Sequence, residues 1–219
     1  MEYNDLIALW KSQDAKLEKA LKMNDLMLIE LINQKAKSSL NSLIRFKVQG
    51  IIGFVLYLLL LGYGLYYAIT YYSSGWNYFI ASVGAIFVIN LKGFSDYIRH
   101  IYLVNKINYD NNVVLIQQQL LDIQLSIINH AKFMCLQFPF YSTFYLSNRW
   151  FPAQVDTVYL IFQCCMTGGL IYFSYWLYNQ HKPENLNKKW FRIMISGSGA
   201  AAIAKALNFY KELDAFREE

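Results

Sequence analysis

The chain contains few charged residues and very few cysteines, histidines and prolines. Charged residues make up 16% of its 219 residues, and cysteine, histidine and proline each occur three times. Every cysteine falls in an apolar stretch, where it behaves as a small apolar residue, so neither a disulfide framework nor a thiolate metal site is indicated. His100, His130 and His181 lie in separate segments, without a Cys or acidic partner at metal-ligand spacing. We therefore expect no metal ion and no cofactor.

Catalytic motifs are also missing from the sequence. No Ser/His/Asp or Cys/His set can be assembled from it. The stretch Ser196-Gly197-Ser198-Gly199 lacks the spacing of a phosphate-binding loop, so we interpret it as either a flexible break or a contact face of small residues. These absences predict a protein that is not an enzyme and has no catalytic residues.

Apolar residues make up 56% of the chain and are concentrated in long runs. A run of about twenty apolar residues is long enough to cross a bilayer as a helix. Four such runs occur, at residues 50–72, 76–95, 131–151 and 157–178. Pro139 predicts a kink in the third run, and Gln163 and Thr167 of the fourth are expected to hydrogen-bond to a neighbouring helix. The sequence therefore predicts an all-α integral membrane protein with four transmembrane helices.

The four apolar runs contain no acidic residue, and Asp96 lies just beyond the second one. Coupled transporters place ionisable groups at membrane depth to bind ions or relay protons. Their absence argues against ion-coupled or proton-coupled transport.

The distribution of basic residues predicts the orientation. The two short turns at residues 73–75 and 152–156, with the run ends beside them, contain one basic residue, Arg149. The other connections are rich in Lys and Arg. The positive-inside rule therefore places both turns outside the cell and both termini in the cytoplasm. The expected segments are a cytoplasmic N-terminal helix (1–47), a transmembrane hairpin (48–95), a cytoplasmic connection (96–130), a second hairpin (131–178) and a cytoplasmic C-terminal helix (179–219).

The N-terminal segment carries an apolar stripe at the spacing of a coiled-coil seam. Residues 3–47 are predicted to be helical, with Asp14 and Asn24 as polar members of the seam, although Asn24 or Asp25 could instead begin a second helix. Such a stripe requires a partner surface. The candidate partner-binding residues are Ile7, Trp10, Leu17, Leu21 and Leu28.

The other two cytoplasmic segments are amphipathic as well. The stripe of the connection comprises Val113, Ile116, Leu120, Ile123 and Ile127, and it follows a break at residues 108–112. The stripe of the C-terminal helix comprises Ile203, Leu207, Tyr210, Leu213 and Phe216. Either the three stripes pack on one another as a helical bundle, or the N-terminal stripe is left free for another protein.

The net charge of +5 is explained by basic residues that flank the apolar runs and meet anionic membrane lipid. Direct nucleic-acid binding is not expected, because the first 47 residues mix eight basic with six acidic residues.

Several short motifs resemble one bacterial family. They are residues 9–17 (LWKSQDAKL), residues 21–24 (LKMN), residues 107–110 (INYD), Pro139, and residues 213–219 (LDAFREE). Together these are similar to a family of uncharacterised four-span inner-membrane proteins of Gram-negative bacteria that are rich in extracytoplasmic-function sigma factors. The resemblance implies location in the bacterial inner membrane. Because members are often encoded beside a sigma factor gene, it also implies an anti-sigma-factor-like regulator, although this chain lacks the His-x3-Cys-x2-Cys motif of some anti-sigma domains.

Two functional hypotheses follow. The first is a non-enzymatic membrane regulator or scaffold whose N-terminal helix binds a cytoplasmic protein, with a sigma factor as the candidate. The alternative is a self-associating structural subunit or channel-like protein, in which the same stripes join copies into a homo-oligomer.

Overall fold

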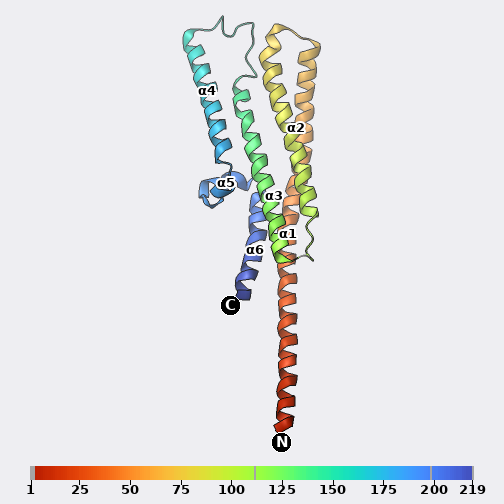
Figure 1. Ribbon diagram of the computed structural model, residues 1–219. Coiled ribbons are helices and arrows are strands. Elements are labelled where there is room, and N and C mark those ends of the chain that lie inside the picture. Colours follow the sequence, from red (N-terminus) through yellow and green to blue (C-terminus); the bar gives the residue numbers. More distant parts are fainter. Residues whose placement is uncertain (1–2, 111, 198, 219) are drawn as a thin grey trace.

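The computed structural model describes residues 3–110, 112–197 and 199–218, and it describes the side chains of these residues except 3–9, 196, 214 and 216–218. Within this part all regular structure is helical and no strand occurs. Figure 1 shows an elongated bundle from which one helix projects far beyond the rest.

The first helix, α1, runs without a break from Tyr3 to Thr70, a length of 68 residues. At 1.5 Å per residue it is about 100 Å long. No proline occurs before Pro139 and no glycine before Gly50, so residues 3–49 contain no helix-breaking residue. The alternative in which a second helix begins at Asn24 or Asp25 is therefore wrong.

The remaining helices are joined by short connections. The 3₁₀ helix η1 (Ser74–Trp76) leads into α2 (Asn77–Asn105), and after a break come α3 (Val113–Met134) and the 3₁₀ helix η2 (Cys135–Ser142). Then follow α4 (Thr157–Gln180), η3 (Pro183–Asn187), α5 (Lys189–Ser196) and α6 (Ala200–Glu218). The side chains of Asn112 and Asp156 cap α3 and α4 by accepting from the first-turn N–H groups of Val114 and Tyr159.

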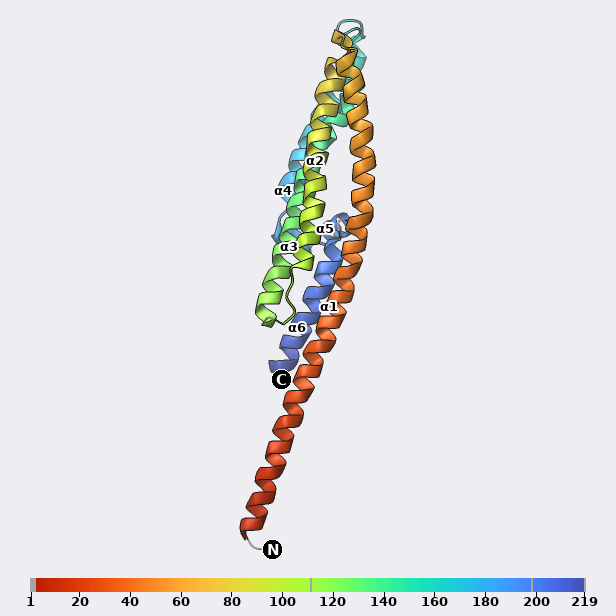
Figure 2. The ribbon, with the colours of Figure 1, turned by 90° about the vertical axis from the view of Figure 1, so that its right-hand side faces the viewer.

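The helices α1, α2, α3 and α4 run alternately up and down the bundle (Figures 1 and 2). The chain termini and the α2–α3 connection lie toward one end, while the turns before α2 and before α4 lie at the other. Three helices are long and apolar enough to cross a membrane, within Trp10–Thr70, Ser74–Asn105 and Thr157–Gln180. About twenty residues suffice for a crossing, so large parts of α1 and α2 extend beyond one.

The third apolar run differs from the kinked helix that the sequence predicted. The α-helix ends at Met134, η2 contains Pro139, and residues 143–156 form turns. Proline has no N–H to donate and clashes with the preceding turn of an α-helix, which explains why the chain adopts 3₁₀ geometry here.

Side chains of the neighbouring helices bond to this irregular segment. Ser174 Oγ of α4 donates to the carbonyl of Cys135 (2.8 Å), and Gln163 Nε2 donates to the carbonyl of Ser142 (2.6 Å). From α2, Asn90 Nδ2 donates to Gln137 Oε1 (3.0 Å). The predicted interhelical role of Gln163 and Thr167 is confirmed, because Thr167 Oγ1 also pairs with Ser142 Oγ (3.0 Å).

The main apolar core lies in the half of the molecule nearest the termini, which we call the basal bundle: residues 28–47 of α1, residues 100–107, and helices α3, α5 and α6. The stripes predicted in α3 and α6 are confirmed as core. The buried residues are Ile32, Ala36, Leu40, Leu43, Val104, Ile107, Val113, Ile116, Leu120, Ile123, Ile127, Ile128, Phe191, Ile195, Ala200, Ile203, Ala206, Leu207, Tyr210 and Leu213. The side chain of Phe216 lies outside the described residues. Burial of one such large side chain contributes about 1.5–3 kcal/mol.

Polar contacts and one glycine set the position of α6 against α1. Tyr210 Oη donates to Asn33 Oδ1 (2.8 Å), and Asn33 Nδ2 donates to the carbonyl of Tyr109 (3.2 Å). The predicted break between helices is present at Gly199, whose φ of +91° favours glycine. A Cβ there would overlap Leu43 of α1, so only glycine allows this close approach.

Candidate functional site: the stalk and its buried anchor

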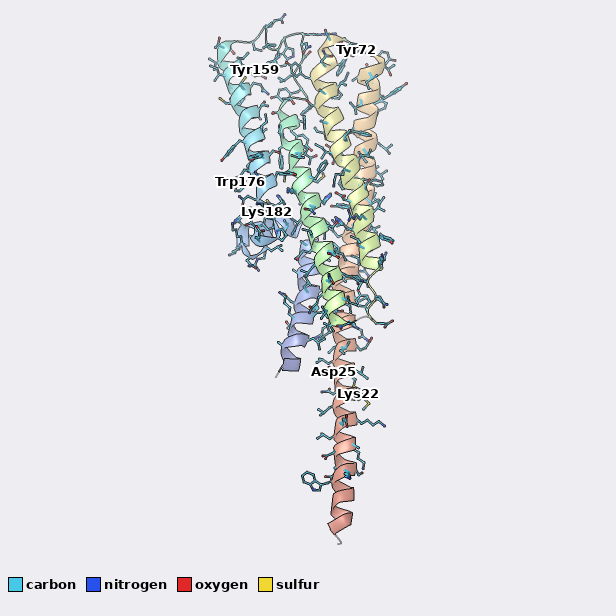
Figure 3. The ribbon with its side chains drawn as sticks, viewed as in Figure 1. Lys22, Asp25, Tyr72, Tyr159, Trp176 and Lys182 are labelled. Atoms are coloured by element: carbon cyan, nitrogen blue, oxygen red, sulfur yellow. The ribbon has the colours of Figure 1, made fainter. Side chains whose placement is uncertain are left out.

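The first part of α1, residues 3–27, projects beyond the basal bundle, and we call it the stalk (Figure 1). Residues 10–24 are all exposed. Trp10, Leu17 and Leu21 retain 66%, 60% and 61% of their possible accessible surface. Figure 3 shows Lys22 and Asp25 on this projecting helix. Of the five residues that the sequence predicted to bind a partner, these three are exposed, whereas Leu28 is half-buried and packs against the basal core. The Ile7 side chain lies outside the described residues.

The exposed seam of the stalk lies beside the face of α1 that packs in the basal bundle. Where the stalk meets the bundle, Leu31 is 47% exposed while its neighbour Ile32 is 7% exposed. Successive residues of a helix differ in direction by about 100°. Leu31 continues the apolar spacing of the stalk on the exposed side of α1 and Ile32 belongs to the core, while the seam residue Leu28 lies between them and packs against the core. The exposed seam and the packed face are therefore neighbouring faces of one helix that meet at Leu28.

Up to residue 22 the other faces of the stalk are mostly polar, whereas nearer the bundle Met23, Leu26 and Met27 also expose apolar surface away from the seam. Lys16, Lys19 and Lys22 lie away from the seam, and Glu18 follows the seam residue Leu17. An apolar seam with lysines on the opposite face is typical of a helix that pairs with another helix. Such a helix gains most of its stability from packing, since an isolated helix is marginal in water.

Lys47 anchors the stalk helix at the top of the basal bundle. Its side chain is 0% exposed, and Nζ has no hydrogen-bond acceptor among the described residues. The ammonium lies 3.8 Å from the centroid of the Tyr97 ring, which is a close cation–π contact. Burial lowers the pKa of Lys47 to about 8, although the nearby Asp96 carboxylate acts in the opposite direction.

Two histidines extend this buried cluster across α2 and α3. His130 Nδ1 donates to Asp96 Oδ2 (3.2 Å), and His100 Nε2 shares a hydrogen bond with Ser126 Oγ (3.1 Å). The His100 and His130 rings are 5.8 Å apart between centroids. Burial, together with the Lys47 charge, lowers the pKa of His100 to about 3 and that of His130 to about 4, although the Asp96 carboxylate acts in the opposite direction on both. Both imidazoles are therefore neutral at pH 7.

The two histidines belong to separate helices, as the sequence shows, but their proximity in the fold was not predicted. The helical spacing of the sequence could have indicated that two members of the cluster are buried. His130 continues the buried stripe of Ile123 and Ile127, and Lys47 continues that of Leu40 and Leu43. His181 is elsewhere, with its Nδ1 3.9 Å from Cys135 Sγ. Among the described residues no group of three or more His, Cys, Asp or Glu is arranged to hold a metal ion. The cluster can position helices and titrate.

Comparisons with known protein families, with curated proteins and with solved structures find no match to this chain.

Proposed function

We propose that the chain crosses the bacterial inner membrane four times, with both termini in the cytoplasm. The three long apolar helices support this, as does the irregular η2, whose backbone carbonyls accept from α4 side chains. Non-helical backbone at membrane depth requires such protein partners. In this arrangement η2 and the end of α3 form the third crossing. The basal bundle and the stalk then lie in the cytoplasm, as the basic residues predict.

We propose further that the protein is a non-enzymatic regulator or scaffold that binds a cytoplasmic protein through the stalk. The observation that carries this proposal is the exposure of Trp10, Leu17 and Leu21 along one seam of a projecting helix. The preferred partner presents an amphipathic helix or a groove that accepts one. A sigma factor is the candidate that the family resemblance suggests, and this choice rests on the resemblance alone.

Co-purification tests the proposal. Full-length protein is extracted from membranes in mild detergent, and the cytoplasmic proteins retained on it are identified. We expect the variant Trp10→Asp with Leu17→Asp to lose the specific partner, because two carboxylates would interrupt the seam. The matched control, Ser12→Asp with Ala15→Asp, adds two carboxylates to the opposite face of the same helix and retains the partner. Equal retention by both variants would show that the seam is not the binding face.

The second candidate function is self-association through the same seam. Its specific support is that membrane anchoring holds the stalks of two copies parallel, which is the arrangement that a parallel coiled coil requires. The monomer mass of 25.6 kDa allows the two candidates to be separated by the mass of the purified protein. A stable multiple of this mass that the Trp10→Asp, Leu17→Asp variant loses would favour self-association. A monomer that captures another protein would favour the regulator.

A further inference from the structure

The short helix α5 combines buried, apolar and basic sectors at the foot of α4. Phe191 and Ile195 are buried in the basal core. The exposed residues are Lys189, Trp190, Arg192, Ile193 and Met194. Because successive residues lie about 100° apart, Trp190 and Met194 share one sector, whereas Lys189 and Arg192 share another.

Aromatic stacking fixes the level of α5 relative to the end of α4. The Trp190 ring stacks on Trp176, with centroids 5.6 Å apart and an interplanar angle of 23°. Trp176 in turn stacks on Phe173 at 6.1 Å. Figure 3 shows Trp176 and Lys182 at the lower end of α4, and α5 lies beside them (Figure 1). Tryptophan is enriched where membrane spans meet the headgroups, so the proposed insertion would place α5 at that depth.

The charge around α5 is strongly positive. The segment 181–196 contains Lys182, Lys188, Lys189 and Arg192, with Glu184 as its acidic residue. All four basic side chains are exposed. An amphipathic helix with apolar and aromatic residues on one sector and basic residues on another is the kind that lies in a membrane surface.

We propose that α5 is an interfacial helix whose basic sector binds anionic phospholipid headgroups of the cytoplasmic leaflet while Trp190 and Met194 enter the acyl boundary. This inference rests on the proposed membrane insertion and is independent of what the stalk binds. The occupant is lipid because the exposed apolar sector adjoins the lipid-facing end of α4, where a dissolved anion would leave Trp190 and Met194 exposed to water.

Lipid retention in mixed nanodiscs tests the proposal. The full-length protein is reconstituted with equal amounts of phosphatidylglycerol and phosphatidylcholine, and the lipids that remain bound are counted by native mass spectrometry. Each basic residue near an anionic surface is worth about a fivefold preference. The triple variant Lys188→Gln, Lys189→Gln, Arg192→Gln should therefore lose at least about tenfold of the phosphatidylglycerol preference.

The control is a triple variant of the stalk, Lys11→Gln, Lys16→Gln, Lys19→Gln, which removes the same charge far from the bilayer. It should keep the wild-type preference. High salt should weaken the wild-type preference, which provides a test if the α5 variant does not fold. Resistance to carbonate extraction checks membrane insertion separately. The role of α5 would be overturned if the inserted protein shows no phosphatidylglycerol preference, or if the α5 variant keeps that preference. The proposed insertion would be overturned if carbonate releases the wild-type protein from the membrane.

Discussion

Replacement of Lys47 by methionine should stabilise the protein at pH 7. The fall of the Lys47 pKa from 10.5 to about 8 corresponds to about 3 kcal/mol of destabilisation, since one pKa unit is worth about 1.4 kcal/mol. The cation–π contact with Tyr97 offsets about 1–2 kcal/mol of this. Methionine fills nearly the same volume without the charge, so we expect a net gain of about 1–2 kcal/mol, or about 2–8 °C in Tm for a chain of this length.

The pH dependence of this gain provides the decisive measurement. Because the folded-state pKa is depressed, the destabilisation is complete below about pH 8 and disappears as the pH rises to 10.5. Thermal melts in detergent, followed by intrinsic fluorescence, should therefore show the advantage of Lys47→Met at pH 7 shrinking over that interval. Lys47→Arg should be less stable than wild type throughout, because a guanidinium stays charged. A methionine variant no more stable than wild type at pH 7, or an advantage independent of pH, would refute the reasoning.

Three further predictions concern other contacts of the fold. The pKa values of His100 and His130 lie below 6.5 in the folded state, so stability present above pH 6.5 should fall on acidification, by about 2 kcal/mol per histidine at about pH 5. Thermal melts from neutral to acid pH measure this loss, and an unchanged Tm would contradict it. Gly199→Ala should lower Tm, because a Cβ at φ +91° is strained and would overlap α1, with a cost of about 1–3 kcal/mol; a neutral effect would show that the α5–α6 break adjusts freely. Gln163→Leu should lower the free energy of unfolding by about 1 kcal/mol, because it removes the hydrogen bonds of Gln163 to the irregular third segment, whereas Cys164→Leu on the exposed face of α4 should leave it unchanged. Equal Tm values for the two variants would show that these hydrogen bonds do not stabilise the segment.

Features that depend on local pattern were predictable from the sequence. The spacing of Leu120, Ile123 and Ile127 identified the buried face of α3, because a helical period determines which residues share a face. Asp156 caps α4, which begins at Thr157 as the apolar run predicted. The sequence left open whether the stripe that includes Trp10 packs in the bundle or is exposed. The packing of the bundle was needed to show that Trp10 is exposed.

Features that depend on contacts between distant segments were not predictable in the same way. Pro139 indicated a disturbance of the third apolar run, but the partners that allow a 3₁₀ segment there, Gln163 and Ser174, come from a later helix. The buried cluster joins Lys47 to His100 and His130 from two other helices, and only the packing of the three brings them together. The number of membrane crossings, the orientation and the partner-binding role of the stalk remain predictions.

The unbroken length of α1 joins the stalk rigidly to the part of the helix that packs in the basal bundle, so the stalk and the bundle move together. Trp10 lies 37 positions before Lys47, a distance of about 55 Å along a rigid helix. A tilt of the whole bundle by about 10° about the level of Lys47 would therefore swing the tip sideways by about 10 Å, and a rotation of the bundle would turn the whole seam with it. If the chain is inserted as proposed, changes in bilayer thickness or in lateral pressure would be converted, without any hinge, into displacement of the tip of the stalk.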